Sequence, residues 1–208
     1  MISSAHNEAK GTPHGVGLIH VMGRDSGFIA AYATLANTHV NYCLVPEDAF
    51  SLYEGEHALL PSLERRLRER KHAVIIVSEG AGQHLFEEES SRRDKSGNVL
   101  HHNIGEFLHE KIVAWGKEIN LDLSVKYFDP SYLIRCLPAH GTDAVFCEML
   151  AQHAVHAAMA GRTDVVIGHW NDRFTHVPIP VATSSRKKID INSSLWDSVK
   201  SVTWKCYR

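Results

Sequence analysis

Residues 73–77 read AVIIV, and the six residues that follow, 78–83, read SEGAGQ. The first segment is apolar on both faces and rich in β-branched side chains, which is typical of a buried strand in a parallel sheet. Glycines come directly after it, so we expect a tight turn where the strand ends. A buried parallel strand needs helices on both sides, and the segment therefore predicts an α/β fold.

Strand-like and helix-like segments alternate on both sides of this strand. Short apolar runs predict strands at four further places, namely 17–22, 40–45, about 123–128 and 165–167. Longer amphipathic runs predict helices at 26–37, 56–70, 103–117 and about 143–160. Asp25 or Ser26 is placed to cap the first of these helices. The order βαβαβαβαβ predicts a mainly parallel sheet with helices on both faces.

Two segments depart from this alternation. Residues 86–98 are charged and rich in turn formers, so we expect a surface excursion between a strand and a helix. The first fifteen residues fit poorly as the start of such a fold, since no strand precedes them. No internal repeat or low-complexity linker is present, and the sequence indicates no domain boundary of its own.

Composition excludes several classes of protein. The 208 residues include 22 Lys and Arg against 24 Asp and Glu, a net charge of −2, so no basic field draws the chain to nucleic acid or anionic lipid. No run reaches the roughly 18 apolar residues of a membrane span, and the N-terminus does not resemble a signal peptide. The four cysteines are scattered, which is typical of reduced thiols. We expect a cytoplasmic protein with no nucleic-acid or membrane partner.

Polar and glycine-rich motifs follow two of the predicted strands, where ligands of open parallel sheets collect. The first strand leads into Met22, Gly23 and Arg24, and the free N–H groups of the next helix suit an anion there. A plain turn is the commoner use of such a glycine. Glu79 follows the strongest strand, where it can accept hydrogen bonds from sugar hydroxyls or serve as an exposed turn or capping acid.

A third motif, FDPSYLIR, occupies residues 128–135. Pro130 breaks the strand, and we expect a loop that presents Tyr132 and Arg135 three residues apart. Arginine in such a loop suits bidentate recognition of phosphate, although a structural salt bridge is its commoner use.

The helix predicted at about 143–160 is a packing helix by its pattern. Four apolar residues share one face, namely Phe146, Leu150, Ala154 and Ala157. His153 lies on the same stripe and is interpreted as a core or interface histidine. His109 and Glu110 begin a zinc-protease pattern, but Val113 stands where its second histidine belongs, so a zinc hydrolase is not expected.

Five segments, taken together, resemble the C-terminal half of the phosphofructokinases, especially the plant and trypanosome type. They are GVGLIHVMGRDSGFIA (15–30), AVIIVSEGAGQ (73–83), FDPSYLIR (128–135), DAVFCEMLAQHAVHAAMAG (143–161) and VPIPVATSSRKKIDINSSLW (177–196). The resemblance runs from about residue 8 to about residue 197. It rests on separate motifs at several strand ends, matched in order and spacing.

The resemblance implies a role for each matching residue. In the family, Met-Gly-Arg contacts fructose 6-phosphate, which implies Met22, Gly23 and Arg24 here, with Arg24 also stabilising charge on the transferring phosphoryl group. The family's glutamate that holds sugar hydroxyls matches Glu79. The segment that binds the sugar phosphate matches four consecutive residues, Tyr132, Leu133, Ile134 and Arg135.

The chain also departs from the family pattern. His20 replaces a lysine that many members carry two residues before the methionine, so a permanent positive charge is missing. Neither the Gly-Gly-Asp-Gly-Thr loop, which holds the donor phosphates and magnesium, nor the Thr-x-Asp motif with the catalytic base is found. Both would lie upstream of Glu8. Asp25 is the one acid next to Arg24, and we expect it to cap a helix rather than act as a base.

The resemblance therefore implies that residues 1–208 are the sugar-phosphate-binding portion of a phosphofructokinase, without its N-terminal donor-binding portion. The complete glycolytic enzyme would transfer a phosphoryl group from ATP or pyrophosphate to the 1-hydroxyl of fructose 6-phosphate. It would use Mg²⁺, for which no ligands are identified in this chain, and form a homo-oligomer. The missing segment, or a separate chain that carries it, is an expected partner. The alternatives are a non-catalytic sugar-phosphate-binding or regulatory subunit and an inactive truncated product.

Overall fold

A computed structural model describes residues 1–55, 58–86, 93 and 100–203. The chain forms two compact units, one made of residues 1–132 and 188–208 and the other of residues 133–187. No helix in the described part of the chain is long and apolar enough to cross a membrane.

The first unit is built on a four-stranded sheet. Its strands are β1 (Gly15–Val21), β2 (Tyr42–Leu44), β3 (His72–Ser78) and β4 (Ser124–Phe128). All three pairings are parallel, in the order β2-β3-β1-β4. These strands confirm the α/β class and four of the five predicted strands.

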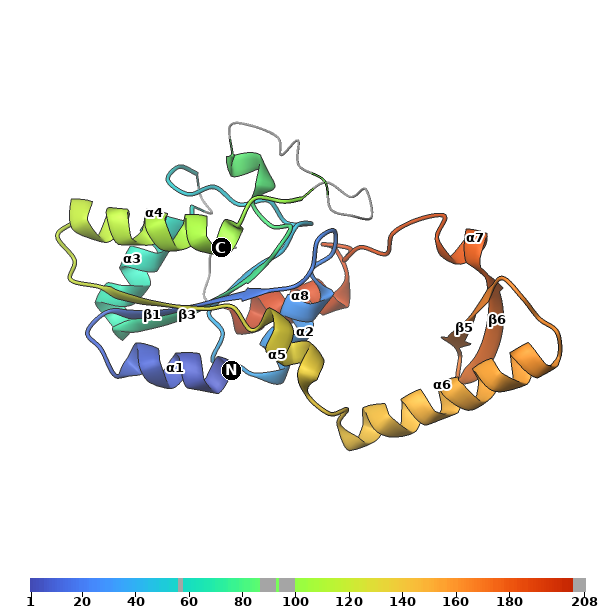
Figure 1. Cartoon of the computed structure of the whole chain (residues 1–208). Coiled ribbons are helices and arrows are strands. Elements are labelled where there is room, and N and C mark those ends of the chain that lie inside the picture. Colours follow the sequence, from blue (N-terminus) through green and yellow to red (C-terminus); the bar gives the residue numbers. More distant parts are fainter. Residues whose placement is uncertain (56–57, 87–92, 94–99, 204–208) are drawn as a thin grey trace. The chain divides into compact units, whose positions relative to one another are not determined.

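Helices cover both faces of this sheet (Figure 1). The helices α3 (Leu59–Arg70) and α4 (Ile104–Glu118) lie on one face, and α1 (Ile2–Lys10), α2 (Phe28–Ala36) and α8 (Ser194–Val202) on the other. Side chains of β3 alternate between the two cores, since Ile75 packs with α3 and α4 while Ile76 packs with the other group. A short 3-10 helix, η1 (Gln83–Leu85), follows β3.

The first helix, α1, corrects the expectation that the N-terminal residues fit poorly in the fold. Ala5 and Ala9 are completely buried. A side chain on Gly17 would lie 2.9 Å from the carbonyl oxygen of Ala5, so the helix backbone rests directly on β1. The N-terminal residues are therefore part of the first unit.

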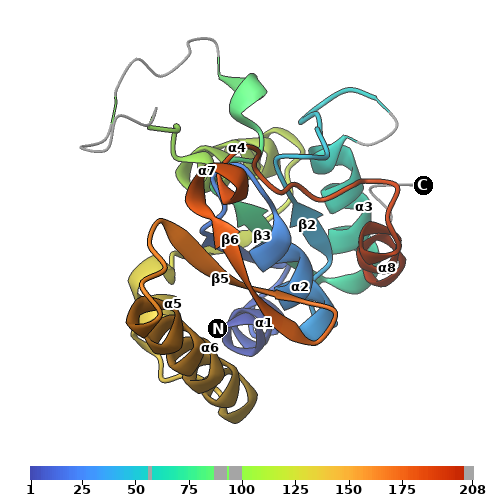
Figure 2. The same cartoon turned by 90° about the vertical axis from the view of Figure 1, so that its right-hand side faces the viewer.

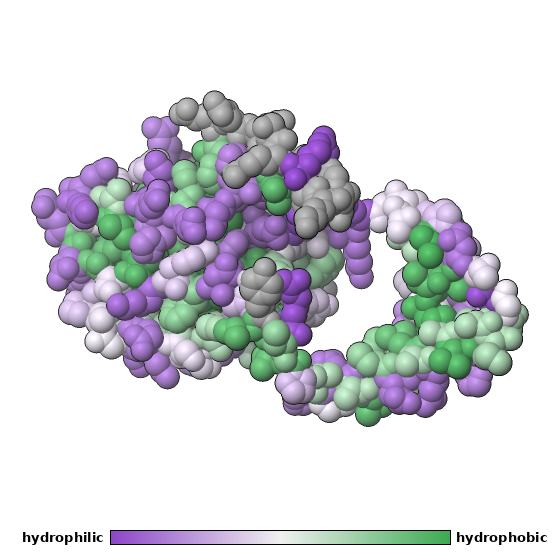
Figure 3. Space-filling model, in the orientation of Figure 1, coloured by the Kyte–Doolittle hydropathy of each residue, from purple (hydrophilic) through white to green (hydrophobic). Residues whose placement is uncertain are grey.

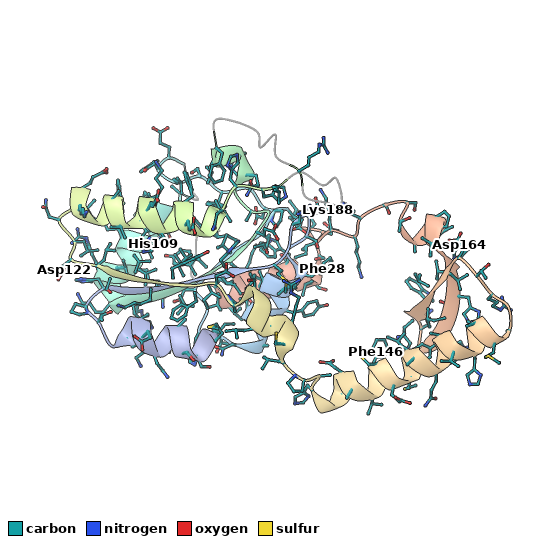
Figure 4. The ribbon with its side chains drawn as sticks, in the orientation of Figure 1. Phe28, His109, Asp122, Phe146, Asp164 and Lys188 are labelled. Atoms are coloured by element: carbon teal, nitrogen blue, oxygen red, sulfur yellow. The ribbon has the colours of Figure 1, made fainter. Side chains whose placement is uncertain are left out.

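The start of α2 also differs from the expectation. The helix begins at Phe28 (labelled in Figure 4), its N-cap is Gly27, and neither Asp25 nor Ser26 caps it. The carboxylate of Glu47 accepts hydrogen bonds from the N–H of Gly27 at 3.0 and 3.1 Å. A distant carboxylate at the helix N-terminus thus takes the capping role, since it satisfies a free donor and complements the helix dipole.

The second unit holds the predicted fifth strand, but not in the parallel sheet. β5 (Val165–Trp170) pairs antiparallel with β6 (Arg173–Pro178). The sequence pattern did not predict β6. Asn171 and Asp172 join them with φ of 46° and 61°, the left-handed conformation of a two-residue hairpin turn. The expectation that this strand extends the parallel sheet is therefore wrong. The tight turn reverses the chain after β5, so β5 pairs with β6 instead.

Three helices complete the second unit. They are α5 (Ser131–Cys136), whose first two residues belong to the first unit, α6 (Gly141–Met159) and α7 (Ile179–Ala182). Helix α6 runs beside the hairpin (Figures 1 and 2), and Phe146 lies 5.9 Å from the ring centre of Phe174 (Figure 4).

The predicted packing role of α6 is only partly correct. His153 stacks on Phe174 at 4.4 Å, although its residue is exposed rather than in a core. Of the four residues in the predicted apolar stripe, only Ala157 is buried. The excursion expected at 86–98 lies outside the described residues, apart from its residues 86 and 93.

Candidate functional site

A pocket of about 240 Å³ opens where the strands of the first unit end. Its walls come from the end of β1, the residue after β3, the segment before α4 and the residues after β4. Nine residues line it, namely His20, Val21, Met22, Glu79, His101, His102, Asn103, Asp129 and Ser131. It therefore lies at the carboxyl edge of the parallel sheet, where the strand-end motifs predicted a site.

The loops after β1 and β3 are bonded to each other. The N–H of Glu79 donates to the carbonyl of Val21 at 2.9 Å, and that of Gly80 donates to the carbonyl of Gly23 at 3.1 Å. Gly23 has a φ of +140°, which other residues rarely adopt. A Cβ on Gly80 would lie 1.7 Å from the carbonyl oxygen of Arg24, so only glycine allows this approach. The two glycines hold the Met22 and Glu79 loops side by side.

His20 joins the pocket to the end of β4. Its Nδ1 is hydrogen-bonded to the hydroxyl of Tyr127 at 3.2 Å and lies 3.8 Å from a carboxylate oxygen of Asp129. Burial, with a contribution from Asp129, raises the pKa of Tyr127 to about 12, so its hydroxyl stays protonated at neutral pH. The backbone N–H of Ser131 donates to Asp129 at 3.1 Å, which fixes the other oxygen of that carboxylate.

Two ring nitrogens in the pocket lining lack a hydrogen-bond partner. The Nε2 atoms of His20 and His101 are buried, and no group in the described part of the chain bonds to either. The pocket also presents two carboxylates, from Glu79 and Asp129, and the amide of Asn103. Such a mixture of acceptors and donors suits a compact ligand with several hydroxyl groups.

The structure brings some of the predicted site residues together. Met22 and Glu79 line the same pocket, and the half-buried Gly23 and Arg24 lie in the bonded loop beside them. The segment 129–135 was expected to be a loop, but from Ser131 onward it is the helix α5 (Ser131–Cys136). A helix forms there because Asp129 and Pro130 stand before its first turn, where both are compatible with a helix start.

The predicted phosphate-binding residues fall in α5. Leu133, Ile134 and Arg135 belong to the second unit and are exposed. The side chain of Tyr132 lies outside the described part. The resemblance assigns Arg24, Glu79 and Arg135 to the binding of one sugar phosphate, and this assignment stays a prediction.

The sequence pattern assigned no role to five polar residues of the pocket: His101, His102, Asn103, Asp129 and Ser131. The place of Asp129 directly after a strand could have marked it. No such signal marks His101 or His102, because they follow the charged excursion rather than a strand.

Among the described residues, no three His, Cys, Asp or Glu side chains are grouped so that they could hold a metal ion. The resemblance assigns the magnesium to the donor-phosphate loop, which this sequence does not contain.

The known proteins with similar sequences are phosphofructokinases. The phosphofructokinase family matches residues 1–158. ATP-dependent 6-phosphofructokinase of Borreliella burgdorferi is 45% identical, and the match covers 97% of this chain and 46% of that protein. The Trypanosoma brucei brucei enzyme of the same name is 44% identical, with 97% and 41% covered. ATP-dependent 6-phosphofructokinase 2 of Arabidopsis thaliana is 40% identical, with 97% and 46% covered.

A solved structure has the same fold at low sequence identity. Pyrophosphate-dependent phosphofructokinase from Marinobacter aquaeolei superposes with a TM-score of 0.66 at 17% identity, over 98% of this chain and 52% of that one. The chain spans about half the length of the curated relatives it matches. Since the family match extends over residues 1–158, more than half of the sequence, the chain belongs to the phosphofructokinase family.

Proposed function

We propose that this chain carries the fructose 6-phosphate site of a 6-phosphofructokinase. The observation that supports this most directly is the pocket at the carboxyl edge of the sheet, where Met22 and Glu79 meet. Relatives that are 39–45% identical are named 6-phosphofructokinases. The pocket offers acceptors for sugar hydroxyls, and the half-buried Arg24 beside it supplies a positive charge near an anionic substrate.

Each residue contributes differently in this proposal. Glu79 accepts hydrogen bonds from sugar hydroxyls, while Met22 and Gly23 form the wall against which the sugar lies. Arg135, with the backbone of residues 132–134, binds the phosphate of the substrate, because guanidinium matches two phosphate oxygens at once. Arg24 stabilises the charge that spreads over the oxygens of the transferring phosphoryl group.

The rest of the reaction needs groups that this sequence does not contain. The 208 residues include no Gly-Gly-Asp-Gly-Thr loop and no Thr-x-Asp motif. We therefore propose that a second polypeptide segment, continuous with this chain or separate from it, supplies the donor site, the magnesium and the base. The donor we propose is ATP, since the relatives above 39% identity are ATP-dependent.

Calorimetric titration with fructose 6-phosphate tests this function. The 208-residue chain should bind the sugar phosphate, and Glu79→Gln should weaken binding by about tenfold, because a charged hydrogen-bond acceptor is replaced by a neutral one. Glu110→Gln, on the exposed side of α4, is the matched control and should bind like the parent. Equal affinity of the Glu79→Gln variant and the parent would contradict the assignment.

A further inference from the structure

His20 is largely buried at the end of β1, and its ring contacts polar side chains. Its side chain is only 14% exposed, and one ring nitrogen is already engaged by Tyr127, at 3.2 Å, and faced by Asp129, at 3.8 Å. The imidazole and phenol rings lie nearly parallel, with an interplanar angle of 22°. The ring is therefore held at the end of β1, two residues before Met22.

The opposite ring nitrogen of His20 has no partner. Its Nε2 is buried, and the described residues provide no group that bonds to it. A buried polar atom without a hydrogen bond costs free energy, so such an atom at a pocket is a candidate for contact with a ligand. His101, across the same pocket, has an unpartnered Nε2 as well. Because both atoms are shielded from solvent, the pocket wall has to shift before a ligand can bond to either of them.

The protonated form of His20 would satisfy both sides of the ring. An imidazolium donates from both nitrogens, so Nδ1–H can face Tyr127 and Asp129 while Nε2–H is left to donate to a ligand. The carboxylate of Asp129, at 3.8 Å, attracts the positive charge. In this form the ring presents a charged donor to an anionic ligand, whereas the neutral ring that donates through Nδ1 presents only an acceptor.

We infer that His20 is a further ligand-contacting residue of the site, and that its proton makes the binding of sugar phosphate dependent on pH. The inference rests on the proposed function, since it names how the same pocket is regulated. The charged and titratable groups around the ring are Tyr127 and Asp129 at the end of β4, His101 and His102 before α4, and Glu79 after β3. Of these, Asp129 is a carboxylate close enough to balance a charge on His20.

Calorimetric titration with fructose 6-phosphate at about pH 6 and about pH 8 tests the inference. The parent should bind about fivefold to tenfold more tightly at the lower pH, the gain expected of a hydrogen bond from a charged donor. The phosphate of the ligand also titrates near pH 6, so variants are needed to separate the two effects.

Three variants separate protonation of His20 from protonation of the ligand phosphate. His20→Lys carries a permanent charge and should retain tight binding at the higher pH. His20→Asn keeps a polar atom near the Nδ1 position but none at Nε2, so it should bind weakly at both pH values. His84→Asn is the control histidine, because its Nε2 bonds to the carbonyl of Phe50 outside this pocket, and it should keep the pH profile of the parent.

The outcomes distinguish this inference from the proposed function. A profile for His20→Asn that falls with pH as steeply as that of the parent would overturn the inference alone. The inference also fails if His20→Lys binds no better than His20→Asn at the higher pH. A parent that binds no fructose 6-phosphate at either pH overturns the proposed function, and this inference with it.

Discussion

Single residues hold the candidate site in shape before any ligand arrives. Gly23 and Gly80 allow two strand-end loops to bond to each other, and Met22 and Glu79 meet as a result. His20 stands where the resemblance implies a lysine in many members of the family, and its hydrogen bond to Tyr127 and the nearby Asp129 give that difference a chemical meaning. Substitutions at this scale should therefore change binding without changing the fold.

Arg135→Ala should weaken the binding of fructose 6-phosphate by about one to two orders of magnitude. The substitution removes a charge-assisted contact with the phosphate that is worth about 1.5–3 kcal/mol. Arg162→Ala, an exposed arginine in the same unit, is the control and should leave the affinity unchanged. Calorimetry that finds the same affinity for the Arg135→Ala chain and the parent would remove Arg135 from the site.

A histidine cluster under α1 should make stability fall in mild acid. His6 stacks on His39 at 4.0 Å and meets the edge of His72 at 5.0 Å. Burial, then the neighbouring His39 and His72, lower the pKa of His6 to about 4. The unfolded chain, with an ordinary pKa of 6.5, therefore binds more protons between these two values, and the free energy of unfolding decreases as pH falls from 6.5 towards 4.

Urea unfolding at a series of pH values measures this effect. His6→Phe keeps an aromatic ring in the stack but cannot take up a proton, so its stability should fall less than that of the parent over the same range. His14→Phe, whose ring bonds to the carbonyl of Asp122, serves as the control for adding a phenyl ring at another histidine. Parallel pH profiles for the His6→Phe chain and the parent would show that another group is responsible.

The sequence identifies site residues where a strand end marks them. Glu79 follows the most recognisable strand, and Met22 follows another, so both were predicted and both line the pocket. His101 and Asn103 were not predicted, because their position depends on how a long excursion returns to α4. The sequence also cannot show that His20 is paired with Asp129, since that contact joins residues 109 positions apart through the β1 and β4 pairing.

At the scale of elements, the strands and helices with a regular hydrophobic pattern could be predicted from the sequence. The strands of the parallel sheet follow from short apolar runs, and helices α3, α4 and α6 from amphipathic runs. The missed elements have weaker patterns. Helix α1 is short and packs through alanines, and the β5–β6 hairpin depends on a turn of Asn171 and Asp172 rather than on a glycine. Glu47 caps α2 from 20 positions away in the sequence, and no local motif predicts such a contact.

Glu47→Ala should destabilise the first unit by about 1–2 kcal/mol, the range found for the loss of a helix cap. The carboxylate accepts hydrogen bonds from the N–H groups of Gly27 and Ile189, the latter at 2.9 Å. It therefore ties the start of α2, next to the Met22 loop, to the segment before α8. Urea unfolding of this chain beside Glu110→Ala, an exposed helical glutamate, gives the comparison. A loss no larger than that of the control would mean that Glu47 does not cap the helix.

At the scale of the whole molecule, the second unit has little core of its own. Among its described residues, Ala157 is the only buried hydrophobic residue. Large side chains are instead exposed, such as Trp170 at 73% and Val155 at 61%, and apolar surface extends along much of this unit (Figure 3). A surface of this kind is expected to meet another protein surface.

The isolated 208-residue chain should therefore self-associate as its concentration rises. Light scattering after gel filtration measures the mass, and Val155→Lys should shift the chain towards the monomer by placing a charge on exposed apolar surface. Ser198→Lys adds the same charge at an exposed position of α8 in the first unit, outside this apolar surface, and should leave the association unchanged. A parent chain that stays monomeric at every concentration would contradict the prediction.

The central claim is that these residues supply the sugar-phosphate half of a phosphofructokinase site, and a coupled assay of phosphoryl transfer tests it most directly. The purified chain should show no turnover of fructose 6-phosphate with ATP or pyrophosphate, because the missing base alone is worth about 10²–10⁴-fold and the donor site more. Adding the part of the Borreliella burgdorferi relative that lies outside the match, in trans or fused before Met1 so that α1 stays intact, should produce turnover that Arg24→Ala abolishes. Turnover by the purified chain alone at an ordinary enzyme's rate would contradict the claim that it supplies only half of the site. If Asp25→Asn abolished that turnover, Asp25 would be the base.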